Sequence, residues 1–405
     1  MLTHITTPRD GLPSLLDSAR AISLAAEQIA SGQGPIAVDT ERAGDFRYDD
    51  RAYLVQLRRQ GAGTFLVDPT VSEEANSALG EVLNSAAWVL HASHTDLPCL
   101  ASLGWSPTVL YDTQIAGRLL GMGQPGLSPM LEEFFHISID KDKGREDWSA
   151  RPLSRSLLTY AALDVEFLLE LHEVTLQQLR ELHREEWYDQ DCAAIRQSAR
   201  PLPTPEWTTM KGIGTLRSPP SMAIARALWT ERNHFALQRN RSPERILKRR
   251  DILHVAQQPS RALTELRDVR MPPALRKRSL PAVREALSLS DAHLPQPTPR
   301  NFGGIPDHKL WPTEFPRAFA AVEMLSEATE TLAQDLSLTP QAIATMKQLR
   351  HAAWKLSQIT PDDSADPIAS YEDVFGHSLE SRGARQWQIE LLSSASLGRI
   401  IDRLA

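Results

Sequence analysis

The sequence is poor in cysteine, since Cys99 and Cys192 are its only two in 405 residues. Two cysteines cannot build a disulfide framework or a four-cysteine zinc site. We therefore expect two buried, reduced thiols. A reducing compartment such as the cytoplasm fits this usage.

Long apolar runs are also absent. Even the rich stretch 86–92 (AAWVLHA) is far shorter than the roughly 18 consecutive apolar residues of a membrane span. The first ten residues, MLTHITTPRD, lack a basic flank followed by an apolar block, so they do not read as a secretory signal. We expect neither a membrane span nor export.

The charges are unevenly distributed, although the net charge is only −7. Residues 1–210 contain 17 basic and 30 acidic residues, whereas residues 211–290 contain 17 basic and 6 acidic residues. An acidic body whose carboxylates need a cation, joined to a basic module that binds a polyanion, would explain this asymmetry. The alternative is an ordinary solvated face on a helical domain.

Proline-rich segments at 201–205 (PLPTP) and 295–299 (PQPTP) mark two breaks in the chain. At about 150 residues per domain, the length predicts two to three domains. The predicted division is a first domain over 1–200, a linker over 201–218, a second domain over 219–294 and a third, helical domain over 295–405.

In the first domain, short β-branched apolar runs alternate with longer segments of helical period, which is typical of an α/β fold. The expected strands are 36–41, 52–57, 64–68 and 88–91, and the first three predict a meander that opens a mixed sheet. The expected helices lie near 73–84, 94–103, 113–121, 127–136 and 154–184. In the second domain, helical segments at 223–238, 243–248, 253–256, 261–266 and 281–287 predict a small all-helical bundle.

The strand 36–41 (IAVDTE) ends in two acids, Asp39 and Glu41. Alternate side chains of a strand share a face, so these two carboxylates should lie side by side. They repel each other and burial increases the penalty, for which a divalent cation is the commonest compensation. A strand end that directs its acids into solvent would give the same pattern.

Two more signals follow along the chain. Asp96 is expected in the first turn of a helix, where an acid also complements the helix dipole. Tyr160 and Asp164 stand four residues apart, so they share one helical face, although a tyrosine at a core edge beside a solvated acid is an alternative. Each signal is weak separately, but the order D-x-E, D and Y-x-x-x-D is much more specific.

This pattern resembles the tyrosine-bearing subclass of the DEDD exonucleases, and the surrounding motifs narrow the resemblance to the ribonuclease D family. Residues 219–294 resemble an HRDC (helicase and ribonuclease D C-terminal) domain, and 295–405 take the place of a second, diverged copy. The resemblance implies an RNase H-like α/β exonuclease domain followed by two small all-α domains of the HRDC type. The motifs that carry it are 91–97 (HASHTDL), 112–114 (DTQ), Lys141, 145–148 (REDW), 151–153 (RPL) and 160–164 (YAALD).

The resemblance also implies roles for single residues. The four carboxylates would hold two divalent metal ions, Mg²⁺ or Mn²⁺, and the tyrosine would position the attacking water. Hard oxygen ligands suit these ions, and a pair of them can stabilise both the entering and the leaving oxygen of a phosphodiester displacement. The residues concerned are Asp39, Glu41, Asp96 and Asp164 as metal ligands and Tyr160 at the water.

The implied activity is metal-dependent 3′-to-5′ exoribonuclease action on structured RNA precursors, transfer RNA above all, by a monomer that releases nucleoside 5′-monophosphates. Two alternatives stay open: an exonuclease of the same chemistry that degrades DNA, and a catalytically idle scaffold that only binds nucleic acid. The presence of all five expected side chains disfavours the scaffold.

Other residues have less specific expectations. His91 is expected to form a hydrogen bond at the strand end or to contact the substrate, and Trp148 and Arg151 are expected to organise the loop before the last helix. Arg42 stands where better-known family members carry an aromatic residue, so the family's contacts to the terminal base do not carry over. Nucleic-acid contact is expected at the basic cluster Lys248, Arg249 and Arg250, and a second dense cluster is 276–278.

Overall fold

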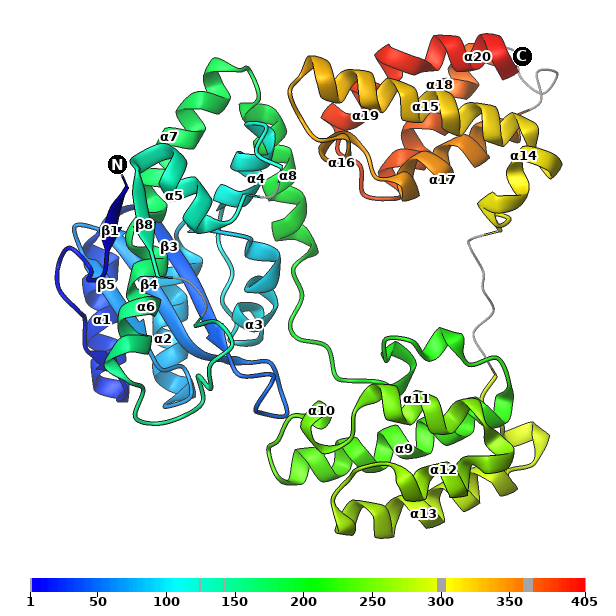
Figure 1. The fold of residues 1–405 in the computed structure, drawn as a ribbon. Helices are drawn as coiled ribbons and strands as arrows, with labels where there is room; N and C mark the ends of the chain where they lie inside the picture. The colour runs from blue at the N-terminus through cyan, green and yellow to red at the C-terminus, as the bar shows by residue number, and fades with distance from the viewer. Residues whose placement is uncertain (1, 124, 141–142, 297–303, 360–366, 405) are drawn as a thin grey trace.

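The computed structural model describes residues 2–404 apart from 124, 141–142, 297–303 and 360–366. Figure 1 shows three groups of elements: an α/β body, a group of middle helices and a group of C-terminal helices. Each group buries an apolar cluster of its own. The predicted division into domains and its boundaries stay a prediction.

The central sheet has six strands in the order β2–β5–β4–β3–β6–β7. Strand β4 pairs antiparallel with β3 and β5, whereas β6 runs parallel to β3 and β7, so the predicted mixed sheet and its opening meander are confirmed. Strands β1 and β8 pair separately. The strands are β1 (Thr3–Ile5), β2 (Leu15–Leu16), β3 (Gln33–Arg42), β4 (Ala52–Gln60), β5 (Gly63–Val67), β6 (Trp88–Leu90), β7 (Leu110–Asp112) and β8 (Ile137–Ile139).

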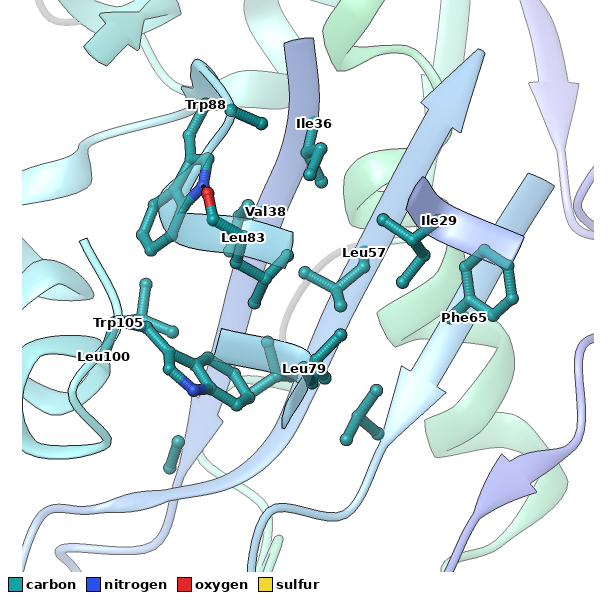
Figure 2. Packing of buried hydrophobic residues seen from close by; sticks show 14 of the residues in the cluster. Ile29, Ile36, Val38, Leu57, Phe65, Leu79, Leu83, Trp88, Leu100 and Trp105 are labelled. Carbon is teal, nitrogen blue, oxygen red and sulfur yellow. Dashed lines mark hydrogen bonds between the residues drawn. The ribbon is translucent and has the colours of Figure 1, made fainter. Parts of the chain in front are cut away.

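The helices of the body cover both faces of this sheet. The first three helices pack on one face of the sheet and form a large core with it, which Figure 2 shows around Ile36, Val38 and Leu57. The opposite face, which includes Ala37, packs against α6 and α7. The helices are α1 (Ala19–Ser31), α2 (Glu73–Asn84), α3 (Leu97–Ser102), α4 (Thr113–Leu119), α5 (Leu127–Phe135), α6 (Arg155–Glu166), α7 (Leu168–Glu181) and α8 (Glu185–Ser198).

The strand period now fixes the faces of β3. Ile36 and Val38 point into the core under α1–α3, so Ala37, Asp39 and Glu41 point toward α6. Both acids therefore lie on one face of a central strand, at the end of that strand where the packing opens.

The prediction of one helix over 154–184 is wrong. The chain leaves the helical conformation at Phe167 (φ −115°, ψ 5°), which separates α6 from α7. The Arg9 guanidinium donates to the Glu166 carbonyl oxygen at 2.8 Å and to its carboxylate at 2.7 Å, so it satisfies a carbonyl that the helix end leaves open. Apolar periodicity cannot reveal this break, because apolar residues continue at helical spacing on both sides of Phe167.

The middle helices form the predicted bundle, but α13 begins at Pro273 and holds Pro281 in its interior. The prediction of a helix start at Pro281 is therefore wrong. Arg276 donates to the carbonyl oxygens of Leu266 and Arg267, each at 2.7 Å, and so fixes the first turns of α13. The middle helices are α9 (Pro219–Gln238), α10 (Pro243–Ile246), α11 (Arg249–Gln257), α12 (Ala262–Asp268) and α13 (Pro273–Ser288).

The C-terminal helices dock on α8 of the body. Trp187 and Trp387 stack with ring centroids 4.6 Å apart, and Arg385 pairs with the Asp191 carboxylate at 2.6 Å. Among the described residues, no helix has the length and apolar character that crossing a membrane requires. The C-terminal helices are α14 (Trp311–Glu314), α15 (Pro316–Asp335), α16 (Pro340–Ile343), α17 (Met346–Ser357), α18 (Pro367–Glu380), α19 (Gln386–Leu392) and α20 (Gly398–Leu404).

Both cysteines are buried and free, as the sequence predicts. Cys99 lies in α3, where its thiol donates to the Asp96 carbonyl oxygen at 3.1 Å. Burial raises the pKa of this thiol to about 12, so it stays protonated and is not a nucleophile.

Candidate active site

Three predicted carboxylates meet where β3 ends against α6. Asp39 and Glu41 project from the strand and Asp164 from the helix, and a carboxylate oxygen of each lies within 4.8 Å of the others. Helix α6 brings Asp164 here because its apolar neighbours Ala161 and Ala162 pack on the sheet. Segments more than 120 residues apart in the chain, as the residue numbers show, thus form one cluster.

Asp96 approaches the same cleft from the other side. Its buried carboxylate accepts hydrogen bonds from the hydroxyls of Thr40 at 2.6 Å and Thr95 at 2.8 Å. Asp96 stands at the N-cap position of α3, yet its side chain makes no capping hydrogen bond. Asp96 thus stands directly before the first turn in which the sequence predicts it, and the helix-dipole alternative stays open.

The four carboxylates and Tyr160 line one cleft of about 680 Å³. The Tyr160 hydroxyl donates to the Asp164 carboxylate, and its ring packs at a tilt against Trp148, with centroids 6.2 Å apart. The predicted pairing of Tyr160 with Asp164 on one helical face is therefore present. Arg145 and Glu146 of the REDW motif form part of the wall together with the preceding Gly144, and Lys141 lies outside the described residues.

Burial and mutual repulsion raise the pKa of the clustered carboxyl groups. Desolvation is the main cause at each, followed at Asp39 and Glu41 by the charges of neighbouring acids. The pKa of Asp39 lies well above its ordinary value, that of Glu41 rises to about 10 and that of Asp164 rises to about 8. The nearby Arg42 guanidinium lowers the pKa of Asp39 and Glu41, but the burial and repulsion outweigh it.

This donor set fits hard divalent cations. Three carboxylate oxygens close enough to share an ion, with a fourth carboxylate lining the same cleft, match the oxygen ligands that Mg²⁺ and Mn²⁺ prefer. A bound cation would also relieve the repulsion that raises these pKa values. The cluster therefore suits a metal-dependent hydrolase.

Asp112, which the DTQ motif contains but the sequence did not single out as functional, fixes the loop that leads to Asp96. Its buried carboxylate accepts hydrogen bonds from the amide of Ala92 at 3.1 Å and from the amide and hydroxyl of Ser93 at 2.8 and 2.6 Å. It also caps α4 by accepting from the Gln114 amide at 2.8 Å. The signal in the sequence that could have indicated this role is the position of Asp112 directly before a helix, where an acid often accepts backbone hydrogen bonds.

His91 lies in the cleft wall as the sequence suggests. Its Nδ1 lies 2.9 Å from the Thr113 hydroxyl oxygen, so it forms the expected hydrogen bond at the strand end. Burial lowers the pKa of His91, so the imidazole is neutral at pH 7. It lines the cleft together with Leu127 and Leu168, and contact with a substrate stays a prediction.

Trp148 and Arg151 organise the segment before α6. The Trp148 indole donates to the Lys143 carbonyl oxygen at 3.1 Å. Arg151 donates to the Asp68 carboxylate at 2.7 Å and to the Tyr53 carbonyl oxygen at 2.8 Å. These bonds tie the segment to β4 and β5, so both residues have the structural role that the sequence predicts.

The 43–51 loop between β3 and β4 joins the cleft to the middle helices. The Phe46 carbonyl oxygen accepts from the Ser242 amide at 3.1 Å, and the Tyr48 amide donates to the Asn240 side-chain oxygen at 3.3 Å. The Arg245 guanidinium lies 4.0 Å from the centre of the Phe46 ring. Because Phe46 and Tyr48 also line the cleft, the turn between α9 and α10 supports one of its walls.

Arg42 precedes this loop and also lines the cleft. The register between β3 and β4 shifts between Glu41 and Arg42, so Arg42 does not follow the simple alternation of the strand. Its guanidinium donates to the Asp50 carboxylate at 2.8 Å. The residue that departs from the family pattern is thus held at the mouth of the cleft.

The two basic clusters of the middle helices differ. Lys248 and Arg250 are exposed and Arg249 half-buried at the start of α11, which leaves this cluster accessible to a polyanion. In the second cluster, Arg276 binds backbone carbonyls and Arg278 pairs with Glu231 at 2.7 Å. These two arginines stabilise the bundle instead.

The comparisons with known proteins agree with this site. A family model described as 3′-5′ exonuclease matches residues 16–180, and one described as 3′ to 5′ exonuclease C-terminal domain matches residues 304–398. Ribonuclease D of Zymomonas mobilis is 31% identical over 263 residues, which are 64% of this chain and 67% of that protein.

Two solved structures resemble the whole chain. A protein from Bifidobacterium adolescentis superposes with a TM-score of 0.83 and 27% identity over 99% of this chain and 100% of its own. Escherichia coli RNase D has the same fold, with a TM-score of 0.68 and 22% identity over 96% of this chain and 99% of its own.

A mixed sheet between two helical layers, with carboxylates clustered at the end of its central strand, defines a metal-dependent 3′-to-5′ exonuclease. Within this class, the chain belongs to the ribonuclease D family and is a 3′-to-5′ exoribonuclease. The match of residues 304–398 is to an exonuclease C-terminal domain, so the assignment of HRDC domains stays a prediction.

The raised pKa values predict how the metal-free protein responds to pH. The ordinary values of Asp and Glu are near 4, whereas Asp164 lies at about 8 and Glu41 at about 10 in the folded chain. Between these limits the folded state binds more protons than the unfolded state, so stability falls as the pH rises. The melting temperature in EDTA should therefore drop between about pH 7 and pH 9, above the titration of the histidines.

Asp164→Asn is the matched variant for this measurement, because it removes one of the repelling charges. It should weaken the pH dependence and melt higher than the wild type at the upper end of the range. A wild-type melting temperature that increases with pH in EDTA would contradict the predicted repulsion.

Asn240 offers a test of the contact between the middle helices and the cleft. Its backbone has a positive φ of 43°, so Asn240→Gly keeps the turn and removes only the acceptor for the Tyr48 amide. Loss of one hydrogen bond, about 1 kcal/mol, should raise KM for RNA about fivefold with little change in kcat. His183→Gly is the control, since His183 also has a positive φ but lies exposed after α7. Equal KM values for Asn240→Gly and wild type would show that this contact does not shape the cleft.

Proposed function

We propose that the chain trims the 3′ ends of structured RNA, with transfer RNA precursors as its natural substrates, and releases nucleoside 5′-monophosphates. The observation that carries this proposal is the single cleft lined by four carboxylates and a tyrosine in a member of the ribonuclease D family. The Escherichia coli relative is described as an exoribonuclease involved in structured RNA processing, which supports the substrate class.

In the proposed mechanism, Asp39, Glu41, Asp96 and Asp164 would hold two divalent cations, Mg²⁺ or Mn²⁺. When bound, such ions neutralise charge on the phosphate and make a nucleophilic water available at neutral pH. The carboxylates must be ionised to bind a cation. Because their pKa values are raised, protons compete with the cations for these carboxylates at low pH.

Tyr160 would position the attacking water. Its hydroxyl donates to the Asp164 carboxylate, so its direction is fixed, and the same oxygen can accept a hydrogen bond from water. In this role the hydroxyl orients the water and does not act as the base that removes its proton. Trp148 holds the ring in place from the other side.

The remaining residues keep this geometry rigid. The hydroxyls of Thr40 and Thr95 hold the Asp96 carboxylate, and Asp112 holds the backbone of the preceding loop. The exposed basic cluster at the start of α11 would attract the RNA phosphates independently of sequence. Binding through this cluster should weaken as the salt concentration rises. We propose that one chain suffices for the reaction.

Matched RNA and DNA oligonucleotides test the substrate assignment. The full chain with Mg²⁺ should shorten a 3′-overhanging RNA hairpin stepwise from its 3′ end, and the same DNA hairpin more slowly. Asp39→Asn should lower the rate about 10³-fold, because lost metal stabilisation of several kcal/mol costs tenfold for about every 1.4 kcal/mol. Product length on a sequencing gel and release of 5′-monophosphates by chromatography provide the readout.

Faster loss of DNA would overturn the substrate assignment and favour the DNA exonuclease. An Asp39→Asn chain that degrades RNA as fast as the wild type would overturn the mechanism. Glu73→Gln is the control for loss of a single acid. Glu73 lies in the first turn of α2 and does not line the cleft.

Tyr160→Phe separates water positioning from metal binding. The variant keeps the ring against Trp148 and removes the hydroxyl, so it should lose about 10²-fold in kcat. The affinity for Mn²⁺ should change little, because the carboxylates remain. A variant with wild-type kcat would exclude Tyr160 from the reaction.

A further inference from the structure

Gln56 in β4 is an unusual buried residue. Its side chain is 0% exposed, and neither the amide nitrogen nor the amide oxygen has a hydrogen-bond partner among the described residues. Buried polar side chains in folded proteins nearly always find such partners, and an exception calls for an explanation. Nothing in the mechanism above uses this amide.

The strand register places Gln56 directly opposite Asp39 of β3. Directly paired residues of antiparallel strands have their side chains on the same face, with Cβ atoms about 4.5–5.5 Å apart. The Gln56 side chain therefore lies in the layer between the sheet and α6, beside the first carboxylate of the cluster. Its other neighbours by register and spacing are the apolar Leu54 and Leu66 and the charged Arg58, whose guanidinium lies 3.7 Å from the Glu166 carboxylate.

In the part of the chain that the structure describes, two other carboxylates of the cleft accept hydrogen bonds from side chains, which Asp39 does not. Asp96 accepts from the hydroxyls of Thr40 and Thr95, and Asp164 accepts from the Tyr160 hydroxyl. Asp39 receives a hydrogen bond only from the backbone at Thr40 among the described residues. An unused amide donor therefore stands directly opposite a carboxylate that, like Glu41, has no side-chain donor among the described residues.

We propose that Gln56 is a positioning residue for Asp39. In the metal-bound protein its amide nitrogen would donate to the Asp39 carboxylate directly opposite it, and so hold the direction of that side chain. An amide suits this place because it donates without charge, whereas a lysine would compete with the cation and an acid would add repulsion. The inference rests on the proposed metal site and adds a residue to its support.

One other acceptor lies in this layer. Glu166 of α6 is fully buried, and its Oε1 is held by Arg9 at 2.7 Å while its Oε2 has no partner among the described residues. If Gln56 paired with Glu166, it would stabilise the body without affecting the cleft. The affinity for a cation separates these two roles.

The test is a titration of the full chain with Mn²⁺. Binding is measured by calorimetry or from the paramagnetic resonance signal of free Mn²⁺. Gln56→Leu replaces the amide by an apolar group of similar size. Removing a hydrogen-bonding partner of a metal ligand costs about 10- to 100-fold in affinity, so we expect at least a tenfold weaker Mn²⁺ affinity. The melting temperature without metal should stay the same or rise, because an unpaired amide has left the core.

Ser279→Ala is the matched control, because Ser279 is also 0% exposed with an unpartnered hydroxyl but lies in α13 of the middle helices. It should leave the Mn²⁺ affinity unchanged. Gln56→Met serves in the same titration if the leucine variant does not fold. At limiting Mn²⁺ the Gln56 variants should degrade RNA more slowly than the wild type. At saturating Mn²⁺ the rates of variants and wild type should be the same.

Folded Gln56 variants that bind Mn²⁺ like the wild type would overturn this inference and leave the proposed function intact. A lower melting temperature without metal, together with an unchanged affinity for Mn²⁺, would show that Gln56 pairs with Glu166 and stabilises the body. A wild-type chain that binds no Mn²⁺ would overturn the proposed metal site itself and this inference with it.

Discussion

The repulsion among carboxylates that share one cleft is the constraint on which the rest of the structure depends. Asp39, Glu41 and Asp164 come within 4.8 Å in a place where burial strengthens every charge interaction. Such a cluster opposes folding, so apolar packing elsewhere must hold it. Ile36 and Val38 on the opposite face of β3 provide that packing, since both are fully buried in the largest core of the body.

The groups that hold the carboxylates are mostly neutral donors. Hydroxyls bind Asp96 and Asp164, and backbone amides bind Asp112 behind them. A neutral donor fixes the direction of a carboxylate but leaves its charge for a cation, whereas an arginine would cancel it. Arg42 is the nearby cation, and its pairing with Asp50 limits how far it neutralises the cluster.

The parts of this arrangement that follow from local spacing could be predicted from the sequence. The period of two in β3 puts Asp39 beside Glu41, and the helical period puts Tyr160 beside Asp164. What the sequence could not show depends on distant partners: Arg9 binds the Glu166 carbonyl oxygen where α6 ends. Strands of two or three residues, such as β2 and β7, have too few positions to display any period.

The basic middle helices do more than add positive charge to an acidic body. Their turn between α9 and α10 binds the loop that carries Phe46 and Tyr48, and that loop runs from Glu41 and Arg42 to β4. Of the two hydrogen bonds, one joins two main chains and the other joins the Tyr48 amide to the Asn240 side chain, so both hold the loop that forms the wall of the cleft. Because the Arg245 guanidinium also lies over the Phe46 ring, the middle helices contact this wall of the cleft through a side chain as well as through hydrogen bonds, so the shape of the wall depends on the position of these helices.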